Sequence, residues 1–121
     1  MRKLDIGTTN FTQVSVGDEP AHGGACHEYY IDRSNNDMSE PAGEFGFIQF
    51  QNGPIKEFGV NGCHQEDLLA IVIDRLQSFQ LGEYACRENA IALTKIQEAM
   101  HWLNHRTNER IKRGVEGTNT K

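Results

Sequence analysis

The chain has 121 residues, of which 37% are hydrophobic and 24% charged, and its formal net charge is −5. Such a length and composition are typical of one soluble domain, here residues 1–121. The longest apolar run, Leu68–Ile73, is far shorter than the roughly 20 residues of a membrane-spanning helix, so we expect no membrane partner. Three cysteines, an odd number, argue against a disulfide framework and favour a reducing compartment. Met1–Asp5 leads into no apolar run, so we expect no signal peptide.

The charge is distributed unevenly along the chain. Residues 1–83 carry a net charge of −8 and residues 84–121 a net charge of +3. DNA-binding domains usually present a broad basic surface, so this distribution predicts no DNA partner. It is compatible with a small anionic ligand held in a pocket and with self-association.

The first half of the chain predicts strands and turns. Phe11–Val16 and Cys26–Ile31 are candidate strands, and polar residues over 34–37 and 40–43 indicate a loop. Phe45–Gln51, with aromatic residues at alternate positions, is the strongest strand candidate.

A hairpin is predicted immediately after that strand. Asn52-Gly53 lies between Phe45–Gln51 and Ile55–Phe58, and this dipeptide is a strong short-range hairpin signal. We therefore expect Ile55–Phe58 to be the returning strand. Pro54 has no backbone donor, so the returning strand should lie at an edge.

The second half predicts a two-helix hairpin. The first helix should span about 63–79 and the second about 84–113, where Gly114 ends it and 114–121 form a flexible tail. The first helix is so apolar that we expect it to be covered on more than one side. Its apolar positions are Leu68, Leu69, Ile71, Val72, Ile73, Leu76 and Phe79.

The two helices differ in length, which leaves part of the second without its partner. At 1.5 Å per residue the first is about 25 Å long and the second about 45 Å. An unsupported end of several turns is only marginally stable. We therefore expect a second subunit to pack there, in an oligomeric α+β protein with an N-terminal antiparallel β-sheet and a C-terminal helical hairpin.

One face of the second helix changes from apolar to cationic along its length. Spacings of three and four residues place six side chains on this face: Ile96, Met100, Leu103, Arg106, Arg110 and Arg113. A solvated helix end is one interpretation, because cations near a C-terminus interact favourably with the helix dipole. The alternative is an anion-binding face, because arginine in a half-buried position usually meets carboxylate or phosphate.

Phe79 and Asn89 flank the turn between the helices. They are either a core residue and a helix-start residue or parts of a nucleobase site, with a ring that stacks and an amide that pairs with a base edge. Metal binding is not expected, because Cys26-His27 and Cys63-His64 lack metal-ligand spacing and His101 with His105 gives two ligands only.

These residues resemble a family of phage proteins. The resemblance covers about residues 45–117 and is strongest in these segments: Gln51–Glu57, Gly59–Gly62, Glu66–Leu68, Asp74–Leu76, Phe79–Gln80, Arg87–Ala90, His101–Leu103 and Arg106–Arg110. The chain looks like the phage Thoeris anti-defence sponge proteins, which share their C-terminal helical hairpin with phage anti-CBASS sponges.

The resemblance implies a function. It implies a homodimer or homohexamer that sequesters glycocyclic ADP-ribose in the cytoplasm of the infected bacterial host, without a cofactor and without degrading the ligand. Some relatives also hold cyclic di- or trinucleotides in separate pockets, which would block CBASS immunity as well as Thoeris. The family's stacking aromatic falls on Phe79, its polar contact on Asn89 and its phosphate- and base-facing arginines on Arg106 and Arg110.

Two further candidates come from the residues alone. Arg113 is added from the helical face, and Lys56 from its charge on a glycine-rich segment. Two alternative functions stay open. One is a small phosphodiesterase or hydrolase of the same signal that uses His101 or His105, and the other is a nucleic-acid-binding adaptor that uses the arginine face.

Overall fold

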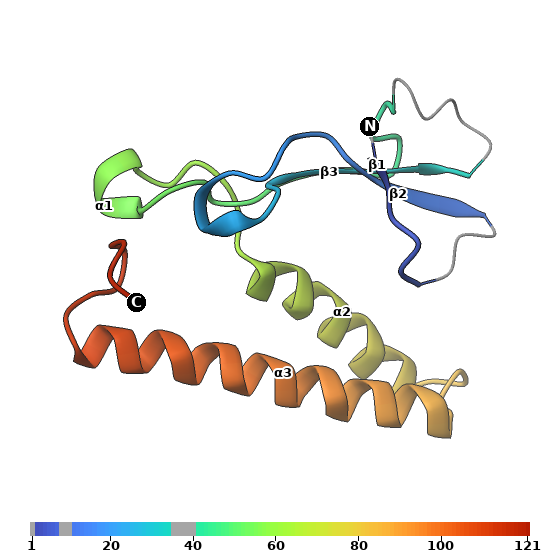
Figure 1. Cartoon of the computed structure of the whole chain (residues 1–121). Helices are drawn as coiled ribbons and strands as arrows, with labels where there is room; N and C mark the ends of the chain where they lie inside the picture. The colour runs from blue at the N-terminus through green and yellow to red at the C-terminus, as the bar shows by residue number, and fades with distance from the viewer. Residues whose placement is uncertain (1, 8–10, 35–40) are drawn as a thin grey trace. The chain divides into compact units, whose positions relative to one another are not determined.

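The computed structural model describes residues 2–7, 11–34 and 41–121, and it divides into two compact units, Met1–Cys63 and His64–Lys121 (Figure 1). The first unit holds the strands and the second the two long helices. The predicted α+β fold, with an antiparallel sheet followed by a helical hairpin, is confirmed.

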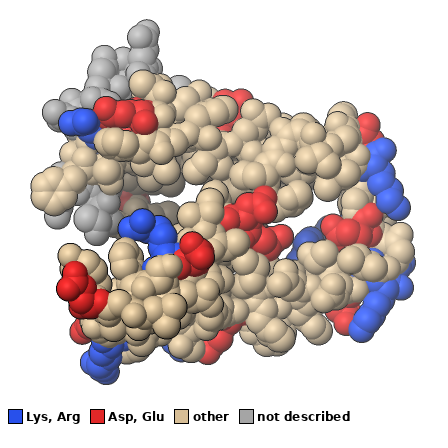
Figure 2. All heavy atoms as spheres, turned by 180° about the vertical axis from the view of Figure 1, so that it is seen from behind, with Lys and Arg blue, Asp and Glu red and all other residues tan. Residues whose placement is uncertain are grey.

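Charged side chains of both signs lie near one another on the face shown in Figure 2. The described residues on that face do not gather their Lys and Arg groups into one basic patch. Several exposed cations are paired with acids, and such pairs contribute at most about 1 kcal/mol each. The pairs are Arg33–Glu44 at 3.0 Å, Lys95–Glu98 at 3.9 Å and Lys112–Glu109 at 3.6 Å.

The first unit is a four-stranded antiparallel sheet in the order β1-β2-β3-β4. The strands are β1 (Arg2–Lys3), β2 (Thr12–Val16), β3 (Glu28–Arg33) and β4 (Gly46–Gln49), and a short 3₁₀ helix, η1 (His22–Gly24), lies between β2 and β3. Three of these strands lie within or overlap the segments expected from the sequence, and β1 was not expected. The loop predicted around residues 34–43 falls largely on 35–40, outside the described residues.

The two faces of this sheet differ in chemistry. One face carries Val14, Val16 and Ile31, and Tyr29 packs edge-on against Phe50 with ring centroids 5.6 Å apart. The opposite face carries Gln13, Ser15 and Asp32, all at most 1% exposed. The Asp32 carboxylate accepts backbone hydrogen bonds from Ala42 and Glu44, each 3.1 Å long. This polar face is therefore partly covered by the chain that approaches β4.

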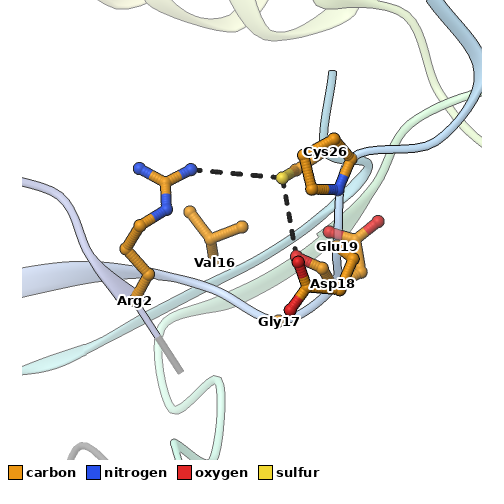
Figure 3. Close-up of a pocket in the computed structure, with 7 residues that line it drawn as sticks. Arg2, Val16, Gly17, Asp18, Glu19 and Cys26 are labelled. Atoms are coloured by element: carbon orange, nitrogen blue, oxygen red, sulfur yellow. Dashed lines mark hydrogen bonds between the residues drawn. The ribbon is translucent and has the colours of Figure 1, made fainter. Parts of the chain in front are cut away.

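Asp18 fixes the connection between β2 and β3. Its carboxylate accepts hydrogen bonds from the backbone nitrogens of His27, at 2.9 and 3.1 Å, and of Glu28, at 3.1 Å. Figure 3 shows the adjacent pocket of about 350 Å³, where the Cys26 thiol contacts Arg2 and donates to the Asp18 carbonyl. The long connection is thereby closed at its base by one part-buried carboxylate.

The predicted β-hairpin at Asn52-Gly53 is wrong. Ile55–Phe58 is not a strand but a single helical turn, α1, with Pro54 as its N-cap. The physical reason is Pro54, whose fixed φ of −64° suits a helix start and whose ring nitrogen cannot donate to a strand ladder. Gly53 turns the chain with a φ of 86° directly before it.

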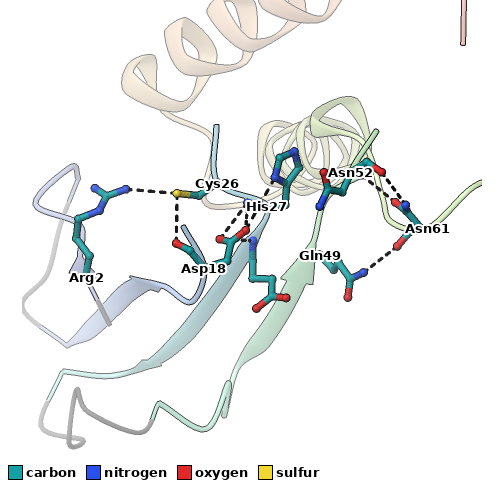
Figure 4. Close-up of polar contacts among 8 residues, drawn as sticks. Arg2, Asp18, Cys26, His27, Gln49, Asn52 and Asn61 are labelled. Carbon is teal, nitrogen blue, oxygen red and sulfur yellow. Dashed lines mark hydrogen bonds and ion pairs between the residues drawn. The ribbon is translucent and has the colours of Figure 1, made fainter. Parts of the chain in front are cut away.

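Hydrogen bonds from the Asn61 side chain take the place of those that the expected hairpin would have made. Its side chain accepts from the Asn52 nitrogen and donates to the Asn52 carbonyl, both at 2.8 Å, as Figure 4 shows. The chain then pairs Phe50 with Cys63 in an isolated parallel bridge. The segment is thus a loop that returns beside its starting point, closed by an asparagine side chain.

The second unit is a hairpin of α2 (Gln65–Gln80) and α3 (Arg87–Lys112), which run antiparallel (Figure 1). Asp67 caps α2 by accepting from the His64 nitrogen at 2.9 Å, and Cys86 caps α3 by accepting from the Asn89 nitrogen at 3.4 Å. Gly114, with a φ of 73°, follows α3 as expected for a glycine after a helix C-terminus. Both predicted helices are therefore confirmed, with boundaries shifted by one to three residues.

The hairpin leaves much apolar surface exposed. No residue of α2 is buried within this single chain, and the expectation that the helix is covered on more than one side stays a prediction. Ile71 is 59% exposed and Trp102, on α3, 66%. Two helices alone bury only one stripe of each, so α2's other apolar residues find no cover in their own unit. No helix among the described residues is long and apolar enough to cross a membrane.

Candidate ligand site at the helical hairpin

A pocket of about 450 Å³ lies at the turn of the helical hairpin. Its walls are Phe79 from the end of α2, Tyr84 and Cys86 from the turn, and Asn89 from the first turn of α3. The structure thus brings together the two residues that the sequence placed at this turn. Tyr84 and Cys86 were missed, although an aromatic residue inside so short a turn is a usable signal.

Aromatic and cationic groups surround the Phe79 ring. The Tyr84 ring packs edge-on against it, with centroids 6.3 Å apart and an interplanar angle of 78°. The Arg75 guanidinium carbon lies 5.1 Å from the ring centroid, one helical turn earlier on α2. An aromatic ring beside a guanidinium is a surface on which planar, electron-rich rings such as nucleobases stack.

Asn89 is held in place from the turn. Its side-chain amide nitrogen donates to the Tyr84 carbonyl at 3.4 Å. The Cys86 nitrogen donates to the Gln80 side-chain oxygen at 3.1 Å, which ties the end of α2 to the start of α3. Among the described residues, none donates to the Asn89 side-chain oxygen.

Arg106 and Arg110 of α3 and Arg113 at its C-cap share a helical face but not an environment. Arg106 and Arg113 are exposed, whereas Arg110 is 8% exposed and is the one buried residue of α3. The Arg110 guanidinium donates to the Glu116 carboxylate at 3.1 Å and to the backbone carbonyls of Val115, Thr118 and Thr120. The predicted flexible tail is therefore folded back onto α3, because its carbonyls satisfy a buried guanidinium.

The arginines lie far from the hairpin pocket of their own chain. Seventeen residues separate Asn89 from Arg106 within one continuous helix, which corresponds to about 25 Å. A pocket of 450 Å³ is only about 10 Å across if roughly spherical. One chain therefore cannot place Arg106 or Arg110 at its own Phe79.

Comparison with known protein families matches this hairpin. Residues 44–108 match the family model described as the Acb2/Tad1 hairpin domain. The chain belongs to this family. The match spans α2 and most of α3 and ends before Arg110, Arg113 and the tail.

One curated relative extends the comparison. The chain is 58% identical over 80 residues to the protein named Thoeris anti-defense 1 of Bacillus phage SBSphiJ7. The aligned part is 66% of this chain and 56% of that relative. The chain therefore spans little more than half the length of the relative that it matches.

The other residues that the sequence suggested for a site do not line the hairpin pocket. Lys56 is exposed on α1 in the first unit. His101 and His105 are exposed on α3 with near-parallel rings 6.5 Å apart, and Trp102 packs edge-on against both. Within the described parts of the chain, no three His, Cys, Asp or Glu residues are grouped so that they could hold a metal ion.

A third pocket lies at one end of the sheet. It measures about 600 Å³ and is lined by Phe11, Thr12, Arg33, Ser34 and Phe45. The Arg33 guanidinium is bound by both carboxylate oxygens of Glu44, at 3.0 and 3.1 Å. The Arg33 guanidinium in this pocket is thus paired with an acid, as the Arg110 guanidinium is paired with Glu116.

Proposed function

We propose that this protein is a phage anti-defence protein that sequesters glycocyclic ADP-ribose, a cyclic nucleotide immune signal, without degrading it. The observation that carries the proposal is the hairpin pocket, where a stacking ring and a polar amide converge at one turn. The family of the chain and the name of its relative support an anti-Thoeris role. The protein would act in the cytoplasm of the infected bacterium, where the signal is made.

The pocket residues have complementary roles toward an adenine ring. Phe79 stacks on the adenine with the face that Arg75 does not cover, and Tyr84 closes one edge. The Asn89 side-chain oxygen accepts from the exocyclic amine of the base. Stacking contributes about 1–3 kcal/mol per base, which makes Phe79 the expected centre of the binding energy.

The phosphates are met by a second copy of the chain. In a two-fold pair, α3 helices that run antiparallel bring Arg106 of the second copy to the turn of the first, whereas its own Arg106 lies about 25 Å away. Exposed apolar residues of the hairpin, among them Ile71, Ile91 and Trp102, supply the surface for this pairing. We therefore propose a homodimer, or a homohexamer built from such dimers, with two equivalent pockets per pair.

The energy of the expected contacts can be compared with what tight binding requires. A nanomolar complex requires about 12 kcal/mol. Hydrogen bonds to charged groups contribute about 1.5–3 kcal/mol each, and Arg106 and Arg110 can form several with two phosphates. Stacking on Phe79 adds to these terms, the cost of ordering the ligand is subtracted from them, and a rigid pocket between subunits keeps that cost low.

A second class of ligand follows from the same family relation. We propose that cyclic di- or trinucleotides bind at a separate site, which would extend the protein's action to CBASS immunity. Lys56, exposed on α1, is assigned to that site on charge alone. Lys56→Ala should weaken binding of a cyclic trinucleotide while leaving glycocyclic ADP-ribose affinity unchanged, and equal loss of both would contradict a separate site.

One experiment distinguishes the sponge from an enzyme. The protein is incubated with glycocyclic ADP-ribose, denatured by heat, and the released nucleotide is analysed by chromatography and mass spectrometry. Intact ligand supports sequestration, whereas a linearised product would identify a hydrolase. A steep salt dependence of binding to duplex DNA would instead favour a nucleic-acid adaptor.

Variants locate the site in the same assay. Phe79→Ala or Arg106→Ala should abolish ligand capture while leaving the oligomer intact. Lys95→Ala is the matched control, because it removes an exposed cation that faces Glu98 on the same helix. If the oligomer dissociates in the Phe79 or Arg106 variant, the affected residue is structural.

A further inference from the structure

The C-terminal latch, defined here as residues 114–121, binds the most buried side chain of α3. Arg110 has a side-chain exposure of 9% and donates through Nε to the Glu116 carboxylate at 3.1 Å. Its Nη2 donates to the carbonyls of Val115, at 2.9 Å, and Thr118, at 3.1 Å, and its Nη1 to that of Thr120. Gly114 and Gly117, with φ angles of 73° and 80°, allow the chain to turn back.

The latch occupies the donors that a phosphate would need. A guanidinium has five N–H donors, and the latch uses four of those of Arg110. A bidentate phosphate contact requires two parallel donors on one edge, so it cannot form while the latch is in place. Arg106, one turn earlier, is exposed and has no such partner among the described residues.

We propose that the latch occupies the Arg110 guanidinium until a phosphate of the ligand displaces it. While the latch is in place, Glu116 neutralises Arg110 and keeps a buried cation satisfied. When an anionic ligand arrives, it first meets Arg106 and then replaces Glu116 and the three carbonyls at Arg110, which releases the latch. This inference rests on the proposed function only in assigning Arg110 to the ligand.

The exchange has a measurable consequence for affinity. Each ligand contact at Arg110 is gained at the expense of a latch contact of similar kind, so the latch lowers the affinity of the full chain. Removing it should expose Arg110 and tighten binding about tenfold. Neutralising the carboxylate alone should have a smaller effect in the same direction, because the carbonyl contacts remain.

The first test measures glycocyclic ADP-ribose binding by calorimetry for three variants. A chain ending at Gly114 and the variant Glu116→Gln should both bind more tightly than the full chain, and Arg110→Ala should bind at least tenfold more weakly. Glu109→Gln is the control, because Glu109 is an exposed acid on α3 that faces Lys112 and not Arg110. Weaker binding by the shortened chain would overturn the proposal and make the latch a structural clamp.

A second measurement keeps the test valid if the shortened chain folds poorly. Hydrogen exchange on the full chain reports the backbone amides of Val115 and Thr118, which donate to the carbonyls of Arg110 and Val115. Saturating ligand should accelerate exchange at both amides and leave the middle of α3 unchanged. Unchanged or slower exchange at these amides with ligand bound would overturn the latch.

Inorganic pyrophosphate separates the latch from the sponge proposal. It carries two linked phosphates and no base, so it can bind the arginines without occupying the hairpin pocket. Release of the latch by pyrophosphate in a protein that captures no glycocyclic ADP-ribose would support the latch and refute the sponge. Capture of glycocyclic ADP-ribose with the latch still protected would refute the latch and leave the sponge intact.

Discussion

Two variants that are each inactive should restore ligand binding when they are mixed. Phe79→Ala removes the proposed stacking ring and Arg106→Ala the proposed phosphate contact. Asn89, which lines the pocket with Phe79, lies about 25 Å from Arg106 along α3. If each pocket combines the turn of one subunit with the arginines of another, a mixed oligomer contains some pockets in which both contributions are intact. The prediction follows from helix length and pocket size, without assumptions about the ligand's orientation.

The expected recovery of binding equals the fraction of pockets in which both the turn and the arginine end are intact. With equal amounts of freely exchanging subunits, half of the turns and half of the arginine ends are intact, so about one quarter of the pockets combine both. This fraction is the same for a dimer and for a hexamer, because each pocket involves only two subunits. Recovered pockets should have wild-type affinity, since every residue in them is unchanged.

The assay is the stoichiometry of ligand bound at saturation. The variants are mixed, dissociated and reassembled, and native mass spectrometry confirms that mixed oligomers have formed. Each variant alone should bind none, the mixture about a quarter of the wild-type amount, and a mixture of wild type with Lys95→Ala the full amount. A mixture that contains mixed oligomers yet binds nothing would refute the two-subunit pocket.

The remaining predictions concern a reactive side chain in the pocket and two positions that hold the first unit together. Cys86 is an exposed thiol in the pocket wall, so glycocyclic ADP-ribose should slow its alkylation by N-ethylmaleimide, as followed by peptide mass spectrometry; equal rates with and without ligand would place the ligand elsewhere. Asp18→Ala should lower the free energy of unfolding in urea by about 2–4 kcal/mol, because it removes the acceptor of the backbone nitrogens of Glu28 and of the buried His27. Glu19→Ala, at an exposed position, should change it by less than about 0.5 kcal/mol. Gly62→Ala should destabilise by about 1–3 kcal/mol, since its Cβ would lie 2.5 Å from the Phe50 carbonyl group, whereas the Cβ of Gly46→Ala would lie at an ordinary 3.5 Å from Ile31; similar melting temperatures for both variants would contradict this.

The elements that the sequence predicts well are those set by local periodicity. Alternation predicts most of β2, β3 and β4, and the spacing of apolar residues predicts both long helices. The hairpin pocket is predictable for a related reason. A short turn between two helices necessarily brings the last turn of one near the first turn of the other, so Phe79 and Asn89 meet there without any long-range information.

The elements that the sequence mispredicts depend on contacts between distant residues. Asn52-Gly53 is a true turn signal, but Pro54 starts a helix and Asn61, nine residues later, supplies the hydrogen bonds that a second strand would have made. Gly53 still turns the chain, but the segment after the turn is a helical turn and not the expected second strand. A dipeptide signal reports the turn and not the structure that follows it.

Arg110 shows that helical periodicity predicts which way a side chain points but not which groups surround it. Its position on the face is the one expected from the sequence, as is that of Arg106, yet one guanidinium is buried and the other exposed. The difference arises beyond Gly114, where helical periodicity ends and backbone carbonyls of the latch become the partners. Carbonyls are present at every residue, so no side-chain pattern identifies those that will be used. A cationic face next to a helix C-terminus therefore has two competing acceptors, an external anion and the chain that follows the helix, and the relative affinity of Arg110 for the two determines whether it is available to a ligand.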